Sequence, residues 1–211
     1  RAPEAQRGVL VHLCMLSNCG FMGYPIVIAI LGEAYLIHAV VFNAAFNIMA
    51  WTVGVLLLNR GRGVNWGKAL LTPALLGAVL GLVLFLTGLR LPDFLQETVE
   101  TLGSLTTPLS MLVIGARMCG QSPRSFLNVR MAAVSALRLI IFPLLTFGIA
   151  LLLGLSPAVR NALTLLIGMP CAAVSAMHAE HYGGDRVLAS GCVTLTTALS
   201  LLTIPLLALL F

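Results

Sequence analysis

The chain has 211 residues, of which 59% are hydrophobic and only 9% are charged. Soluble domains carry about 25% charged residues, so this chain has too few charges to cover a surface that faces water. The composition therefore excludes an ordinary soluble domain and predicts a protein whose solvent is the lipid bilayer. The net charge of +5 is spread without a basic run or interleaved aromatic residues, which argues against nucleic-acid binding.

The apolar stretches are much longer than ten residues, so they predict membrane-spanning α-helices and not the strands of a barrel. We expect an all-α integral membrane protein with about seven transmembrane helices. Their approximate bounds, in chain order, are about 9–31, 35–58, 70–86, 102–118, 131–153, 157–177 and 187–211. Connecting segments that hold charged residues, such as NRGRGVNWGK and RLPDFLQETVE, are predicted to be loops.

The basic residues are distributed unequally between the two sides of these helices. Nine lie on the side where the first span begins and two, Arg90 and Arg160, on the other, while Arg138 lies within a span. Positive charge is retained on the cytoplasmic side of a membrane protein. We therefore expect a multi-pass protein of the inner (plasma) membrane whose C-terminus is outside. The residues that mark the cytoplasmic side include Arg60, Arg62, Lys68, Arg117 and Arg124.

Two of the predicted spans share a weak sequence repeat. The first holds Gly23-Tyr24-Pro25 followed by Glu33-Ala34-Tyr35, and the sixth holds Gly168-Met169-Pro170 followed by Glu180-His181-Tyr182. The charge count places these spans in opposite directions, so they resemble corresponding parts of an inverted repeat. Proline removes a backbone donor and glycine leaves helical geometry easily, so each motif predicts a helix broken within the membrane. Broken helices in corresponding positions of two halves indicate the binding site of a transporter.

Several segments resemble the auxin efflux carrier family, which includes bacterial malate- and malonate-type permeases. They are SNCGFMGYPI (17–26), VFNAAFNIMAWTVGVLLLNRG (41–61), TTPLSMLVIGARM (106–118), LRLIIFPLL (137–145) and the stretch from GMPCAAVSAMHAEHYGG to SLLTIPLL (168–207). The matches follow the family order and cover nearly the whole chain. One position departs from the pattern: many bacterial relatives have Asn where this chain has Val174, with Ser175 beside it.

The resemblance implies a ten-helix carrier of two inverted five-helix repeats, in which the broken fourth and ninth helices cross at the substrate site. The chain then corresponds to helices four to ten. Residues 1–60 end the first repeat, 61–69 form a basic cytoplasmic loop, and 70–211 make up the second repeat. A homodimer is compatible with this arrangement.

The predicted function is secondary active transport of a small organic anion, such as a carboxylate, by alternating access. No enzyme is predicted, because GxSxG, HExxH and the nucleotide-binding GxxxxGK[ST] are absent from the sequence. No cofactor is expected, and a proton or sodium gradient is the candidate driving force. Two alternatives stay open: a sodium-coupled symporter resembling the bile-acid carriers, and a membrane sensor or partner subunit that does not transport.

The candidate substrate-binding residues lie in or beside the two predicted breaks, or in the fourth and fifth spans. They are Asn18, Gly23, Pro25, Thr107, Pro108, Ser110, Arg138, Gly168, Pro170 and Ser175. Asn18 is interpreted either as a ligand contact or as a bridge between the two breaks. Residues 107, 108 and 110 either line the cavity or pack between helices.

Ionisable residues within a membrane are functional candidates by default. Arg138 lies about 12 Å deep at 1.5 Å per residue, where it either attracts a carboxylate or extends its long side chain to the cytoplasmic interface. Glu180 is a candidate for proton coupling, with a solvated interface residue as the alternative. Asn43 and Asn47 share one helix face and are predicted to hold helices together. His178 and His181 have no third ligand at metal spacing, so no metal site is predicted.

Overall fold

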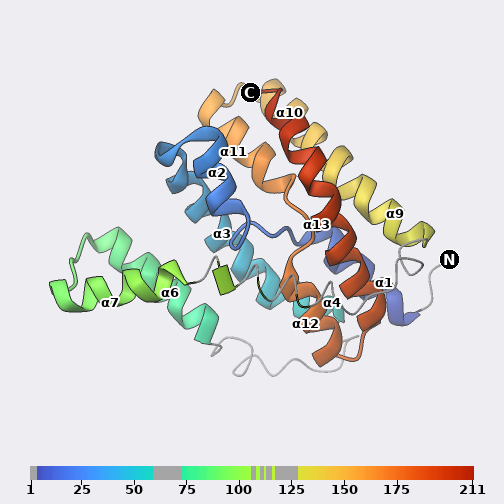
Figure 1. Cartoon of the computed structure of the whole chain (residues 1–211), viewed down its shortest axis with the longest axis horizontal. Coiled ribbons are helices and arrows are strands. Elements are labelled where there is room, and N and C mark those ends of the chain that lie inside the picture. The colour runs from blue at the N-terminus through green and yellow to red at the C-terminus, as the bar shows by residue number, and fades with distance from the viewer. Residues whose placement is uncertain (1–3, 59–72, 106–107, 110–111, 113–115, 117–127) are drawn as a thin grey trace.

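The computed structural model describes residues 4–58, 73–105, 108–109, 112, 116 and 128–211. Within these ranges the named elements are all helical, and the β-type pairing is a single isolated bridge between two non-helical segments. The helices pack into one bundle from which a pair of helices projects (Figure 1). An all-α fold is therefore confirmed.

Two of the predicted spans are broken, as expected. In each, two half-helices of nine to twelve residues flank a short non-helical segment. The first span consists of α1 (Glu4–Met15) and α2 (Gly23–Leu31), with the break at 16–22. The second consists of α11 (Pro157–Ile167) and α12 (Ala173–His181), with the break at 168–172.

Three continuous helical stretches in the described part of the chain are long and apolar enough to cross a membrane: Glu33–Gly54, Val129–Leu152 and Arg186–Ala208. The first joins η1 (Glu33–Tyr35), α3 (Leu36–Met49) and a π-helical turn, η2 (Ala50–Gly54), before α4 (Val55–Leu58). The second joins α9 (Val129–Ala136), the π-helical η4 (Leu137–Ile141) and α10 (Phe142–Leu152). The third is α13 (Arg186–Ala208).

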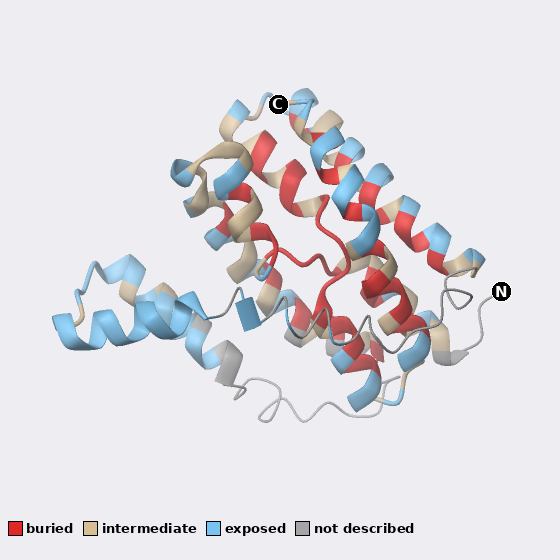
Figure 2. Ribbon diagram, viewed as in Figure 1, coloured by how far each residue is buried: buried red, intermediate tan, exposed pale blue. Residues whose placement is uncertain are grey.

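Several polar side chains lie inside the bundle, and many large apolar ones are exposed. Arg138 and His12 are each 1% exposed, whereas Leu152 is 89% and Leu201 is 76% exposed. Figure 2 shows buried residues concentrated along the centre of the bundle and exposed ones along its outer helices. Polar groups inside and large apolar groups outside fit a bundle surrounded by lipid.

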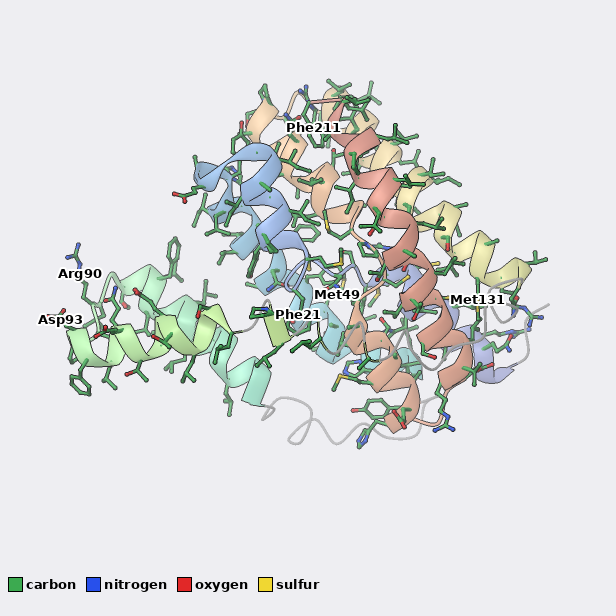
Figure 3. All side chains as sticks on the ribbon, in the orientation of Figure 1. Phe21, Met49, Arg90, Asp93, Met131 and Phe211 are labelled. Carbon is green, nitrogen blue, oxygen red and sulfur yellow. The ribbon has the colours of Figure 1, made fainter. Side chains whose placement is uncertain are left out.

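Two apolar clusters lie on either side of the breaks. One lies among α2, α3 and α11 and includes Val27, Phe46 and Leu166. The other lies among α1, α12 and α13 and includes Leu13 and Ala179. Met131 and Phe211 lie near opposite ends of the bundle (Figure 3). The broken segments therefore sit between two separately packed halves of the core.

One end of the bundle is fixed by hydrogen bonds between the starts of three helices. The amide nitrogen of Gln6 donates to Asp185 Oδ2 at 2.7 Å, and Arg130 Nη1 donates to Gln6 Oε1 at 2.6 Å. Asp185 Oδ1 also caps α13 by accepting from the Leu188 N–H at 2.9 Å. The N-terminal ends of α1, α9 and α13 thus lie together.

Helices α6 (Pro73–Thr87) and α7 (Asp93–Ser104) project from the bundle, with Arg90 and Asp93 at their outer end (Figures 1 and 3). The prediction that RLPDFLQETVE is a loop is wrong, because most of it forms α7. Pro92 precedes the helix, Asp93 supplies an acid in its first turn, and Gln96 Nε2 donates to Glu100 Oε1 one turn on at 3.0 Å. The basic loop at 61–69, Thr107 and Ser110 lie outside the described residues.

Candidate functional site

The two broken segments are joined by main-chain hydrogen bonds. The Asn18 N–H donates to the Pro170 carbonyl at 2.8 Å, and the Ala172 N–H donates to the Leu16 carbonyl at 3.0 Å. Together these bonds form an antiparallel bridge between Ser17 and Cys171. Backbone groups freed by a break cannot face lipid, so each segment satisfies the other. The breaks therefore cross each other directly; we call this the crossing (residues 16–22 and 168–172).

The Gly-x-Pro motifs do not occupy equivalent places in the two broken helices. Gly168 and Pro170 lie in the break itself, whereas Gly23 and Pro25 form the first turn of α2. Proline fits a first turn because the N–H it lacks would have no intrahelical partner there. The first break therefore ends before the motif that predicts it, and the residues that meet at the crossing are 16–18 and 170–172.

A cavity of about 280 Å³ opens beside the crossing. Both breaks and helix α3 supply its walls. The lining residues are Ser17, Asn18, Cys19, Gly20, Phe21, Asn43, Phe46, Asn47, Ala50, Ala172, Ala173 and Val174. Ser17 and Asn18 are 2% and 3% exposed, and neither Ser17 Oγ nor Asn18 Nδ2 has a hydrogen-bond partner among the described residues. Both residues belong to the cavity wall, and their two buried polar atoms have unused hydrogen-bonding capacity.

Asn43 and Asn47 of α3 also line this cavity, which the sequence did not predict. Asn43 Nδ2 donates to the Tyr24 hydroxyl at 2.7 Å, and its Oδ1 accepts from Cys19 Sγ at 3.2 Å. Asn43 therefore links α3 to α2 and to the first break, as helix-joining asparagines do. The i, i+4 spacing was the available signal, but spacing alone does not distinguish a helix contact from a cavity wall.

Arg138 lies at the crossing, on the π-helical turn η4. Its Nη1 donates to the Cys14 carbonyl and its Nη2 to the Met169 carbonyl, each at 3.1 Å. These carbonyls lie where α1 and α11 end, and a helix C-terminus carries partial negative charge. The guanidinium thus connects the ends of both broken helices in the interior of the bundle. It is not among the residues that line the cavity.

The two candidate glycines serve close packing. A Cβ on Gly23 would lie 3.0 Å from Leu166 Cδ2, and one on Gly168 would lie 2.6 Å from Leu207 Cδ2. Neither residue lines the cavity. Pro170 is buried and contributes its carbonyl to the crossing.

The other candidates lie at various distances from the crossing. Ser175, in the first turn of α12, is 1% exposed and follows the cavity residue Val174. Pro108 is exposed and lies beyond α7. Glu180 is at the surface, where its Oε1 lies 3.7 Å from Arg186 Nη1.

Two buried histidines near the crossing are not predicted from the sequence to be functional. His12 Nδ1 lies 3.0 Å from Ser175 Oγ, and His12 Nε2 lies 3.1 Å from His178 Nδ1. His12 belongs to α1, and the other two belong to α12. A single histidine on an apolar helix has no spacing partner, so only its position inside a predicted span could have indicated it.

Comparison with known proteins adds a family match. The model of a family described as "Membrane transport protein" matches residues 1–65 and 62–208. An uncharacterized transporter of Methanothermobacter thermautotrophicus is 32% identical over 206 residues, covering 94% of the chain and 66% of that protein. An uncharacterized transporter of Methanocaldococcus jannaschii is 28% identical over 217 residues, covering 96% and 68%. The chain spans about two thirds of the length of both relatives.

Proposed function

Because the chain belongs to the membrane transport protein family, as its resemblance to auxin efflux carriers predicts, we propose that it is a secondary carrier of small organic anions. The anion binds in the cavity beside the crossing and is released on either side by alternating access. The observation that carries this proposal is that two residues of the cavity wall, Ser17 and Asn18, hold buried side-chain atoms, Oγ and Nδ2, without a hydrogen-bond partner among the described residues.

The direction of the four half-helices favours an anion. The N-terminal ends of α2 and α12 adjoin the cavity, since residues 17–21 precede α2 and residues 172–174 begin α12. Helix N-termini carry partial positive charge and unsatisfied N–H groups. The opposite ends, those of α1 and α11, are already neutralised by Arg138. The cavity therefore receives the positive halves of both broken helices.

The size of the cavity favours a small solute. Its volume of about 280 Å³ is just below the range of about 300–1,000 Å³ typical of pockets for drug-sized ligands. The wall combines a few polar groups, Ser17, Asn18, Asn43 and Asn47, with apolar ones such as Phe21 and Phe46. This combination suits a compact carboxylate with a short carbon skeleton.

The division of the core supports alternating access. Helices α1 and α12 lie together on one side of the crossing, and α2 and α11 lie together on the other. Each pair has its own apolar cluster. A rearrangement around the crossing would open the cavity past one pair and close it past the other, as in other carriers with broken helices.

The test is counterflow of radiolabelled malate, malonate and indole-3-acetate in proteoliposomes. We expect saturable exchange of at least one of them, and its loss in the Asn18→Ala variant. Ser135→Ala is the matched control, because Ser135 is equally buried and its hydroxyl donates to the Met131 carbonyl of its own helix. If the folded parent exchanges no carboxylate, or Asn18→Ala exchanges it normally, the proposal is wrong.

A further inference from the structure

Three buried polar side chains form a continuous hydrogen-bonded chain beside the crossing. His12 lies in the middle, with Ser175 Oγ 3.0 Å from its Nδ1 and His178 Nδ1 3.1 Å from its Nε2. Ser175 and His12 are 1% exposed and His178 is 4% exposed. We call this group the relay (Ser175, His12 and His178). Its members do not line the cavity, so the anion site proposed above does not account for them.

The relay connects the two half-helices on one side of the crossing. His12 lies in the last turn of α1, and Ser175 and His178 share a face of α12 because they are three residues apart. Gly54 makes room for the imidazole: a Cβ at that position would lie 3.1 Å from His12 Nε2. The first member, Ser175, directly follows the cavity residues 172–174. The relay therefore runs from the edge of the cavity toward the C-terminal end of α12.

The hydrogen bonds of the relay have two self-consistent directions. A neutral imidazole donates from one nitrogen and accepts at the other. In one arrangement the Ser175 hydroxyl donates to His12 Nδ1, and His12 Nε2 donates to His178 Nδ1. In the other arrangement both bonds are reversed. Switching from the first arrangement to the second moves one proton along each bond toward His178, while Ser175 Oγ takes a proton from water and His178 Nε2 returns one to water.

An added proton has a defined place in the relay. A protonated His12 donates from both nitrogens, so Ser175 Oγ and His178 Nδ1 both accept. The new N–H bond forms at an imidazole nitrogen as the O–H bond of a hydronium ion breaks, and the reverse step returns the proton to water. Two imidazolium ions 3.1 Å apart would repel strongly, so the pair holds one added proton.

We propose that the relay is the coupling site of the carrier and that the anion moves together with a proton. This inference rests on the proposed function and names its coupling ion. A positive charge on His12, whose ring is hydrogen-bonded to Ser175 in the first turn of α12, attracts an anion in the cavity. By linkage the bound anion favours protonation of the pair to the same extent. Anion and proton then cross the membrane as a nearly neutral pair.

The helices packed around the relay carry other ionisable groups, and the described contacts of these groups do not involve His12. They are Arg7 and Cys14 of α1, Glu180, His181 and Tyr182 on or just after α12, Asp185, Arg186 and Cys192 at or in α13, Arg130 of α9 and Arg138 of η4, while the segment Ala50–Leu58 has none. Arg130 and Asp185 bind Gln6, and Glu180 pairs with Arg186. Among the described residues no carboxylate is hydrogen-bonded to His12, so its ring nitrogens face Ser175 and His178.

The transport test measures pH-driven accumulation and counterflow of the carboxylate panel in proteoliposomes. With one proton per anion, a gradient of one pH unit drives about tenfold accumulation. We expect His12→Gln and His178→Gln to lose this accumulation and to keep counterflow, which needs no driving force. His181→Gln, an exposed histidine of the same helix, is the control and should accumulate like the parent. Normal pH-driven accumulation by His12→Gln overturns the relay while normal counterflow upholds the carrier.

A second measurement does not depend on transport. In ¹⁵N-histidine NMR of the purified protein, the four histidines are assigned by single substitutions. We expect His12 and His178 to take up one proton as a unit, so that His178→Gln changes the titration of His12 and leaves that of His181 unchanged. A titration of His12 that is independent of residue 178 overturns the proposal, even for a protein that moves none of the carboxylates tested.

Discussion

The main-chain N–H of Asn18 donates to the carbonyl oxygen of Pro170 at 2.8 Å, while the Asn18 side chain amide nitrogen has no partner among the described residues. The same residue therefore holds the crossing together through its backbone and offers its side chain to the cavity. The backbone contact and the proposed anion contact are separable at this position, because a change of side chain leaves the backbone bond in place.

This separation leads to the first prediction. Asn18→Asp replaces a donor amide with a carboxylate at nearly constant shape, so it should leave folding intact and repel an anion. We expect the KM for carboxylate counterflow to rise by at least about tenfold, which corresponds to the loss of one charge-assisted hydrogen bond. Thermal unfolding in detergent serves as the control for folding. An unchanged KM in a folded variant would remove Asn18 from the binding site.

Arg138 is predicted to stabilise the crossing. Its guanidinium donates to the carbonyls of Cys14 and Met169 in the interior of the bundle. Arg138→Met leaves both carbonyls without this donor, and we expect it to lower the free energy of unfolding by about 3 kcal/mol or more. Arg138→Lys keeps the charge but cannot donate to both carbonyls in the same geometry. Its free energy of unfolding should therefore lie between that of the parent and that of Arg138→Met.

The control for Arg138 is Arg160→Met. Arg160 lies with its Cζ 5.0 Å from the centroid of the Phe147 ring, outside the crossing. Its replacement is expected to lower the free energy of unfolding by no more than about 1 kcal/mol. Equal denaturation curves for Arg138→Met and the parent would contradict the stabilising role.

Gly168 is predicted to be required for the packing of α13 on the second break. A Cβ there would lie 2.6 Å from Leu207 Cδ2, so Gly168→Ala should destabilise the protein by about 1–3 kcal/mol. The double variant Gly168→Ala/Leu207→Ala should lose less stability than the two single variants added together, because the clashing side chain is gone. Gly148→Ala is the control, since no atom lies within 4 Å of its Cβ position. Additive effects of the two substitutions would show that Leu207 is not the obstacle.

The sequence predicts the two breaks, and the family resemblance implies that they cross, but neither indicates which groups join them. Proline and glycine inside long apolar stretches are local signals, so the positions of both breaks and of Asn18 could be predicted. The bridge between Ser17 and Cys171 consists of main-chain hydrogen bonds, which leave no residue pattern. Similarly, nothing in the sequence near Arg138 indicates that its partners are the carbonyls of Cys14 and Met169.

The sequence also gives little signal for the contacts of single buried residues and for helices rich in charged side chains. His12 has no spacing partner in its own helix, and its contacts come from α12, far along the chain. Helix α7 was predicted as a loop because it contains four acidic or amide side chains. On a helical surface such residues support one another at i, i+4 spacing, as Gln96 and Glu100 do.

Gly54 provides a test of the relay that leaves every ionisable group in place. A methyl group at this position would lie 3.1 Å from His12 Nε2 and 3.3 Å from its Cδ2, so the imidazole must move by a few tenths of an ångström. The bond from His12 Nε2 to His178 Nδ1 is the contact on that side of the ring. We therefore expect Gly54→Ala to lower pH-driven carboxylate accumulation several-fold and to leave counterflow close to that of the parent.

The measurement is the ratio of the rate of pH-driven uptake to the rate of counterflow in the same proteoliposomes. This ratio cancels differences in the amount of folded protein. Gly148→Ala again serves as the matched control, because its new methyl group meets no atom within 4 Å. If Gly54→Ala lowers counterflow and accumulation equally, the methyl group disturbs the carrier as a whole and not the proton path. If it lowers only accumulation, the position of the His12 ring controls coupling, since no titratable side chain has been removed.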